Sequence, residues 1–206
     1  MGFERNVFVN CPFDDQFLPL LRPLLFTIIY LDLNPRIALE RTDSGESRLD
    51  KIVQLIRESK YSVHDLSRSE AGAVGELYRL NMPFELGLDF GCRLFGSPRS
   101  RQKKTLVLES IPHRYKAAIS DLSGADVECH HDEPYKVIGV VRNWLKSSCL
   151  PAAVGPARVE AAFTRFMTDD YNALTDEGFS AADIAALPIG ELIERMQNWV
   201  EASRHS

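Results

Sequence analysis

The stretch Asn6-Val-Phe-Val-Asn-Cys-Pro-Phe-Asp-Asp15 decides the fold of this chain. Its first five residues are rich in β-branched and aromatic side chains, which predict a short strand. Pro12 cannot continue a central strand, and the two aspartates that follow are suited to cap a helix. The mostly apolar residues 16–31 then predict a buried helix, which Pro23 kinks or delays. A strand that leads directly into a helix is the first unit of an α/β fold.

The same alternation continues along the chain. Four further strands are predicted at residues 36–40, 61–66, 104–109 and 126–130. Amphipathic helices are predicted after Ser47, from about Pro83 to Leu94, and from Glu133 to Lys146. Strands that alternate with helices indicate a parallel sheet covered on both faces. The expected fold class is therefore α/β, a flavodoxin-like three-layer sandwich with a mainly parallel sheet of about five strands.

Two domains are expected, an α/β domain at residues 1–150 and a helical C-terminal extension at residues 151–206. The prolines and the glycine within residues 151–156 mark the boundary. The extension holds four basic and nine acidic side chains, which together account for the whole net charge of −5. Its last helix has one apolar face, made by Ile189, Leu192, Ile193, Met196 and Val200. An acidic helical tail suggests an assembly surface, so a homo-oligomer is expected.

Length and composition exclude several classes of protein. The chain has 206 residues, of which 45% are hydrophobic and 26% charged, as in soluble globular proteins rather than disordered or fibrous ones. Its longest apolar stretch, residues 17–31, is interrupted by two prolines and an arginine and is too short to cross a bilayer. The flanks of this stretch do not resemble a signal peptide. These features predict a soluble, cytoplasmic protein with no membrane partner.

Neither a nucleic-acid partner nor a bound metal or cofactor is expected. The charge balance gives no basic face for nucleic acid. The four cysteines are far apart with no Cys-x-x-Cys pair, and His130 and His131 are adjacent rather than spaced for metal binding. The sequence also lacks the glycine-rich phosphate-binding motifs of dinucleotide-binding and P-loop proteins, and the nucleophile elbow of serine hydrolases.

The most informative segment for chemistry is Asn81-Met-Pro-Phe-Glu-Leu-Gly-Leu-Asp-Phe-Gly91. It places a carboxylate, Glu85, among apolar residues in the first turn of a predicted helix. That helix begins near the edge of the sheet where ligands bind in parallel α/β folds. Gly87 and Gly91 lower helix stability, a cost most easily explained by close packing or by close approach of a ligand. On spacing alone, Glu85 is equally well explained as a residue that complements the helix dipole.

The chain resembles the nucleoside 2-deoxyribosyltransferase-like group, whose fold is close to that of bacterial TIR NADase domains. The resemblance runs in order through residues 6–146 and is most specific at the Phe-Glu-Leu-Gly segment. The segments that carry it are Val7-Phe-Val-Asn-Cys-Pro-Phe13, Tyr61-Ser-Val-His-Asp65, Phe84-Glu-Leu-Gly-Leu88 and Lys104-Thr-Leu-Val-Leu108.

This resemblance implies roles for particular residues. Glu85 corresponds to the glutamate that attacks, or electrostatically supports, the anomeric carbon of a ribose as its bond to a base breaks. Asp65, the second catalytic candidate, would contact ribose hydroxyls or pass a proton to the leaving base. An ordinary strand-end turn is the equally weighted alternative for Asp65. The substrate-binding candidates along the same edge of the sheet are Asn10, Pro12, Phe13, Asp43, Ser44, Arg48 and Asn81.

Two of these candidates have structural alternatives. Phe13 either stacks on a base or staples the first helix. Arg48 either binds a substrate phosphate or is an ordinary charge on a helix face.

The expected function is cleavage or transfer at the ribosyl–base bond of NAD, a nucleotide or a nucleoside. NAD would then be a substrate rather than a cofactor, and the protein would serve as a bacterial defence or signalling effector. Two other functions remain open. The first is a non-catalytic nucleotide-binding sensor or adaptor that works through oligomerisation. In the second, the helices of residues 156–206 dock into a homo-oligomer or a second protein, with the α/β body as scaffold.

Overall fold

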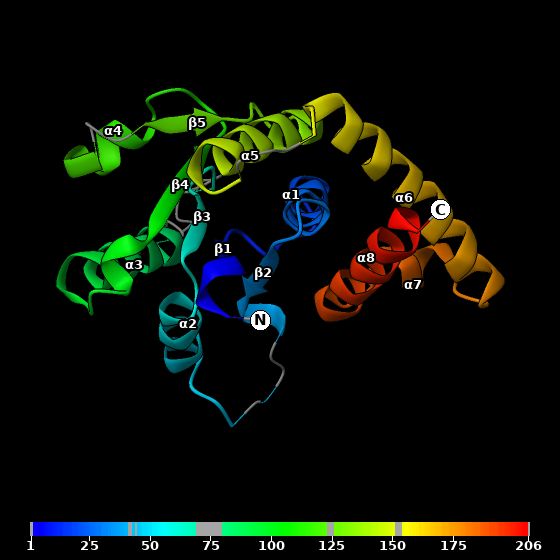
Figure 1. Cartoon of the computed structure of the whole chain (residues 1–206), viewed down its shortest axis with the longest axis horizontal. Coiled ribbons are helices and arrows are strands. Elements are labelled where there is room, and N and C mark those ends of the chain that lie inside the picture. The colour runs from blue at the N-terminus through cyan, green and yellow to red at the C-terminus, as the bar shows by residue number, and fades with distance from the viewer. Residues whose placement is uncertain are drawn as a thin grey trace, which may run out of the picture.

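In the part of the chain that the structure describes, five strands pair into a single, wholly parallel sheet (Figure 1). The computed structural model describes residues 2–40, 43, 45–68, 80–122, 126–150 and 154–205. The strand order is β2-β1-β3-β4-β5, which is that of the flavodoxin-like doubly wound fold. The predicted fold class is therefore confirmed. The strands are β1 (Asn6–Asn10), β2 (Asn34–Ile37), β3 (Tyr61–Asp65), β4 (Lys104–Glu109) and β5 (Val127–Cys129).

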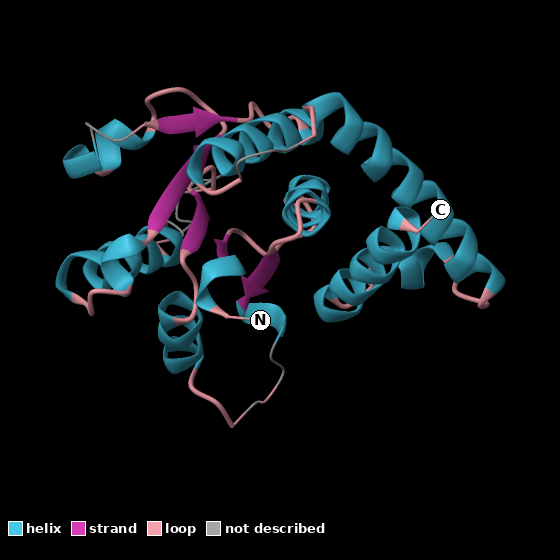
Figure 2. Ribbon diagram, viewed as in Figure 1, coloured by secondary structure: helices cyan, strands magenta, loops and turns pink. Residues whose placement is uncertain are grey.

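Helices cover both faces of this sheet, as Figure 2 shows. Alternate side chains of β1 divide between the faces, because successive residues of a strand point in opposite directions. Val7 and Val9 share a core with α1 and α5, whereas Phe8 packs with α2 and α3. The helices are α1 (Leu18–Tyr30), α2 (Arg48–Arg57), α3 (Asn81–Phe95), α4 (Tyr115–Ala118), α5 (Pro134–Ser148), α6 (Pro156–Asp176), α7 (Ala181–Ala185) and α8 (Ile189–Arg204).

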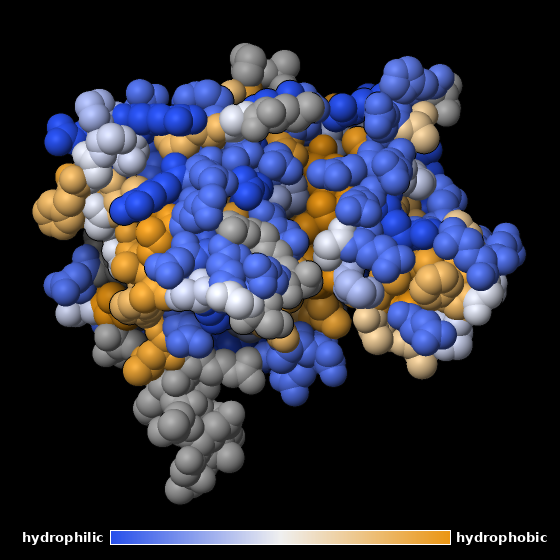
Figure 3. Space-filling model, turned by 90° about the horizontal axis from the view of Figure 1, so that it is seen from below, coloured by the Kyte–Doolittle hydropathy of each residue, from blue (hydrophilic) through white to orange (hydrophobic). Residues whose placement is uncertain are grey.

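The C-terminal helices share the largest core of the molecule with α1 and α5. Phe26 of α1 has its ring stacked on that of Phe166 of α6, with centroids 5.5 Å apart, and its ring centroid is 5.9 Å from that of Trp199 of α8. Figure 3 shows hydrophobic residues gathered along the junction between the α/β body and these helices. Helix α1 therefore has protein on both sides, which explains why residues 17–31 are mostly apolar rather than apolar on one face only.

Two predicted boundaries are corrected. The second strand, expected at residues 36–40, lies at Asn34–Ile37, and Ala38–Glu40 form a turn of 3-10 helix. Pro35 is tolerated there because β2 is an edge strand, where a missing N–H need not break the ladder. Helix α3 begins at Asn81 rather than near Pro83, so Glu85 lies in its second turn and not in its first.

Pro23 lies inside α1 rather than at its start. The ring removes one backbone hydrogen bond from the helix. One turn later the Thr27 hydroxyl donates to the Pro23 carbonyl oxygen at 2.7 Å. Among the described residues, no helix is long and apolar enough to cross a membrane.

Candidate active site

The site lies where the order of the strands changes direction. In this fold the crevice beyond the carboxyl ends of β1 and β3 is the usual place for a ligand. Asn10 ends β1, His64 and Asp65 end β3, and all three side chains are buried. Helix α3 contacts both strands and brings Glu85 to the same region. Asn10, Asp65 and Glu85, three of the predicted site residues, therefore lie at this edge of the sheet, together with His64.

Glu85 is a buried carboxylate with a shifted pKa. The residue is only 4% exposed, and burial raises its pKa from 4.5 to about 7. The guanidinium of Arg48 on α2 opposes this shift, with Nη2 at 3.8 Å from Oε1 of Glu85. The carboxylate thus titrates near neutral pH, in the range where a catalytic acid, base or nucleophile is most effective.

Cys11 shows which carboxylates gather around the end of β1. Burial is the main reason that the pKa of its thiol lies well above 9.0. The negative charges of Asp65, Glu85 and Asp14 raise the pKa of Cys11 further, in that order. The thiol is therefore neutral at physiological pH, and a neutral buried thiol is a poor nucleophile. Cys11 therefore adds no reactive group to this edge of the sheet.

Asn10 connects the end of β1 to the first turn of α3. Its Nδ2 lies 2.9 Å from the carbonyl oxygen of Met82 and 2.9 Å from Nδ1 of His64. Met82 comes three residues before Glu85, so this contact fixes the start of the helix that carries the carboxylate. The predicted binding residue is therefore part of the framework that positions Glu85.

A buried polar group that the sequence interpretation missed lies beneath Glu85. Oδ2 of Asp89, one turn further along α3, accepts hydrogen bonds from Nε2 of His64 at 3.1 Å and from Oγ of Ser62 at 2.5 Å. Nζ of Lys103 is 3.0 Å from Oδ1 of Asp89, as an ion pair without hydrogen-bond geometry. The signal was a second carboxylate four residues after Glu85 on a mostly apolar helix face.

Asp89 is held as a carboxylate. Burial alone would raise its pKa, but the hydrogen bond from His64, the charge of Lys103 and the hydrogen bond from Ser62 lower it below its usual range. The Lys103 ammonium also donates to two backbone carbonyls, of Ile56 at 2.8 Å and of Ser59 at 2.5 Å. The charged pair is thus enclosed by polar partners, as a buried ion pair requires.

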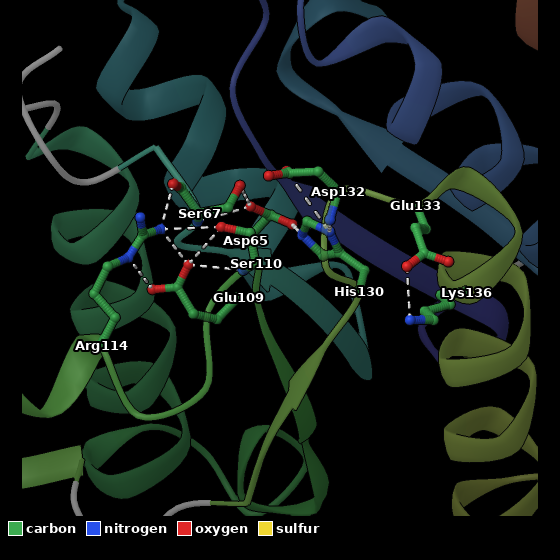
Figure 4. A network of polar contacts seen from close by, with 9 residues as sticks. All are labelled: Asp65, Ser67, Glu109, Ser110, Arg114, His130, Asp132, Glu133 and Lys136. Carbon is green, nitrogen blue, oxygen red and sulfur yellow. Dashed lines mark hydrogen bonds and ion pairs between the residues drawn. The ribbon is translucent and has the colours of Figure 1, made fainter.

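Asp65 belongs to a second network, drawn in Figure 4. Its Oδ2 lies 3.0 Å from Nε2 of His130, and its Oδ1 accepts from the Ser67 hydroxyl and from the Ser67 backbone N–H at 2.9 Å. Arg114 binds both the Ser67 carbonyl oxygen and the carboxylate of Glu109. These contacts join the ends of β3, β4 and β5. Both Asp65 oxygens are used inside the chain, which favours the strand-end turn over contact with a substrate.

The remaining candidates are more scattered. Phe13 is half-buried and packs against the main core, as the staple interpretation expects, and Pro12 is buried beside it in sequence. Asp43 and Asn81 are exposed, and the Asp43 carboxylate accepts from the Gly45 N–H at 2.8 Å. Ser44 lies outside the described residues. The structure therefore gathers Asn10, Arg48 and Glu85.

The two glycines of α3 are not explained by packing within the chain. A Cβ atom added at Gly87 or at Gly91 would meet nothing within 4 Å. Both glycines, with Leu88 and Phe95 of the same helix and Val53 of α2, line a surface groove of about 730 Å³.

Neither a family model nor a curated protein nor a solved structure matches this chain. Among the described residues, no group of three or more His, Cys, Asp or Glu side chains is placed to hold a metal ion. The chemistry of the site is therefore argued from the geometry of its own side chains.

Proposed function

We propose that this protein cleaves or transfers at the N-glycosidic bond between a ribosyl group and a base, in NAD, a nucleotide or a nucleoside, and that Glu85 is its catalytic residue. The observation that carries the proposal is the position of Glu85, which is buried at the switch point of the sheet and titrates near pH 7.

The reaction explains why a shielded carboxylate is useful at this position. When a ribosyl–base bond breaks, positive charge develops at the anomeric carbon. A carboxylate beside that carbon stabilises the charge or forms a covalent bond to it, and it does so more strongly where water is excluded. With a pKa of about 7, roughly half of the Glu85 side chains are ionised at neutral pH before any cationic substrate binds. The developing charge of the sugar favours the ionised form further.

Arg48 supports a substrate that carries phosphate. Its guanidinium lies beside Glu85, yet about half of the side chain is exposed. A half-exposed arginine beside the carboxylate can hold a phosphate oxygen in NAD or a nucleotide while the sugar reaches the carboxylate. A free nucleoside would not use this contact.

Product analysis tests the proposal directly. The purified chain is incubated with NAD, with AMP and with adenosine, and free base is measured by chromatography. Base release is expected from at least one of them, and Glu85→Gln is expected to lower the rate at least a hundredfold. Glu133→Gln, which changes an exposed glutamate on the surface, is the matched control and should keep full activity. Unchanged turnover in Glu85→Gln would refute the role of this residue.

The contact with Arg48 also favours a second candidate function, a non-catalytic nucleotide-binding sensor or adaptor. A carboxylate that is ion-paired and half-protonated can serve a binding site as well as a reaction. Binding of NAD or AMP with no release of base from concentrated protein would support this candidate and exclude the enzyme.

In either case we propose a cytoplasmic defence or signalling effector that acts as a homo-oligomer. Support for the assembly comes from large apolar side chains of α3 and the residue before it that are exposed, namely Leu80, Phe84, Leu94 and Phe95.

A further inference from the structure

The side-chain amide of Asn10 has a fixed direction. Because a carbonyl oxygen can only accept a hydrogen bond, the Asn10 atom 2.9 Å from the Met82 oxygen must be the nitrogen, Nδ2. The same nitrogen faces Nδ1 of His64 at 2.9 Å, so both of its N–H groups are used. Oδ1 of Asn10 is buried and has no hydrogen-bond partner among the described residues. The residue as a whole is 1% exposed.

The direction of this amide determines the protonation of His64. Since Nδ1 accepts from Asn10, the ring proton is on Nε2, which donates to Oδ2 of Asp89 at 3.1 Å. Lys103 already balances the charge of Asp89, so a neutral imidazole leaves this buried network without excess charge. A chain of contacts therefore runs from Lys103 through Asp89 and His64 to Asn10. Within it, the donor and acceptor of one hydrogen bond determine which atoms donate and accept in the next.

We infer that Oδ1 of Asn10 accepts a hydrogen bond from a hydroxyl of the ligand's sugar, and that His64 and Asp89 are positioning residues that keep this oxygen turned toward the ligand. The inference rests on the proposed function, because it takes the ligand to be a ribosyl compound. A buried acceptor without a donor is unfavourable, and a ligand hydroxyl removes that penalty. Through Met82, the same amide is tied to the helix turn that precedes Glu85, so sugar and carboxylate are held by one framework.

The position of the His64 ring proton, and with it the direction of these hydrogen bonds, is tested first on the unmodified protein. Nitrogen-15 NMR of the histidine rings distinguishes a protonated from an unprotonated ring nitrogen, and the His64→Gln spectrum assigns the signals. For His64 we expect a protonated Nε2 and an unprotonated Nδ1 at pH 7. A protonated Nδ1, in a neutral or a charged ring, would turn Oδ1 of Asn10 toward His64 and overturn the inference.

The ligand hydroxyl is tested by binding. Calorimetry on Glu85→Gln, which prevents turnover, compares adenosine with 2′-deoxyadenosine and 3′-deoxyadenosine. At least tenfold weaker binding is expected for one of the two deoxy compounds. Equal affinity for all three would overturn the inference while leaving the proposed function in place. A failure of adenosine to bind, with no base released from adenosine, AMP or NAD, would overturn the proposed function as well.

Asp89→Asn tests the positioning role. An amide at position 89 can donate to Nε2 of His64, which moves the ring proton to Nδ1 and reverses the Asn10 amide. We expect this variant to bind adenosine and the deoxy compounds with affinities within about threefold of each other. Ser62→Ala is the control, since it removes another hydrogen bond to Asp89 but keeps the His64 proton on Nε2. Ser62→Ala should still bind one of the two deoxy compounds at least tenfold more weakly than adenosine. If Asp89→Asn does not fold, two measurements with Asp89 in place decide the question. These are the histidine NMR spectrum of the unmodified protein and the binding of the deoxy compounds to Glu85→Gln.

Discussion

At Glu85, the burial that shields a reacting sugar from water also opposes ionisation of the carboxylate. The folded chain holds the proton more tightly than the unfolded chain, because the pKa is about 7 in the fold and 4.5 for a free side chain. The associated stability is fully present below about pH 4.5 and is lost as the pH rises through 7. The site is therefore least stable at the pH where the carboxylate is ready to react.

This linkage predicts the stability of Glu85→Gln. The amide has no charge to bury, so the variant should be more stable than the wild type at pH 8 by about 2 kcal/mol, once solvent screening is allowed for. At pH 4 the two proteins should have nearly the same stability, since Glu85 is then neutral in the folded state and mostly neutral in the unfolded state. Denaturant unfolding at the two pH values measures the difference. An equal free energy of unfolding at pH 8 would contradict the raised pKa.

Arg48 lowers the pH at which the proposed reaction begins, against the effect of burial. Base release should increase as the pH rises through about 7, because the ionised form of Glu85 is the reactive one. In Arg48→Gln the cation that lowers this pKa is lost, so the rise should move to higher pH by roughly one unit. Arg57→Gln, an exposed change at the other end of α2, should leave the profile in place. A profile that does not move in Arg48→Gln would show that the ion pair has no effect on the reaction.

The sequence predicts which residues reach the site better than it predicts what they contact there. Glu85 and Asn10 follow from the pattern of strands and helices. The hydrogen bond between Asp65 and His130 does not follow from that pattern. His130 is distant in sequence and reaches Asp65 only because β5 pairs with the sheet. The contact of His64 with Asp89 likewise depends on α3 lying over β3.

At the scale of elements, α3 is held to the sheet by a charged group as well as by apolar packing. Replacing Asp89 by Leu leaves Lys103 buried without its counter-charge, so we expect a loss of about 3–5 kcal/mol in the free energy of unfolding. The double variant Asp89→Leu with Lys103→Met removes both charges and should recover most of that loss. A double variant as unstable as Asp89→Leu alone would show that the hydrogen bonds to His64 and Ser62, rather than the ion pair, hold the helix.

Element positions follow from local chemistry except where tertiary structure decides them. The pattern of residues 104–109 gives β4 correctly because its apolar run is bounded by polar residues. Pro35, in contrast, lies inside β2 because that strand is at the edge of the sheet, and strand order is not visible in the sequence. The same applies to Pro23, which the packing of α1 on both sides keeps inside a continuous helix.

At the scale of the whole molecule, the C-terminal helices cover the outer side of α1. The apolar face predicted for the last helix is buried, and its Leu192, Ile193, Met196 and Val200 belong to the same core as the sheet. The sequence predicts this face but not its partner, because periodicity shows that a face is apolar and not what it packs against. An interaction with another chain through this face would first have to displace it from α1.

This packing predicts that the chain cannot be divided at residue 150 without loss of the fold. A fragment of residues 1–150 would expose the outer side of α1, including Phe26, and should aggregate or unfold without cooperativity. The single change Phe166→Ala tests the same contact in the full chain, with an expected loss of about 3–5 kcal/mol in the free energy of unfolding. Tyr171→Ala, on an exposed position of the same helix, should change stability by less than about 0.5 kcal/mol. A soluble fragment 1–150 that melts cooperatively would show that the α/β body folds without its C-terminal helices, and would leave those helices available for assembly.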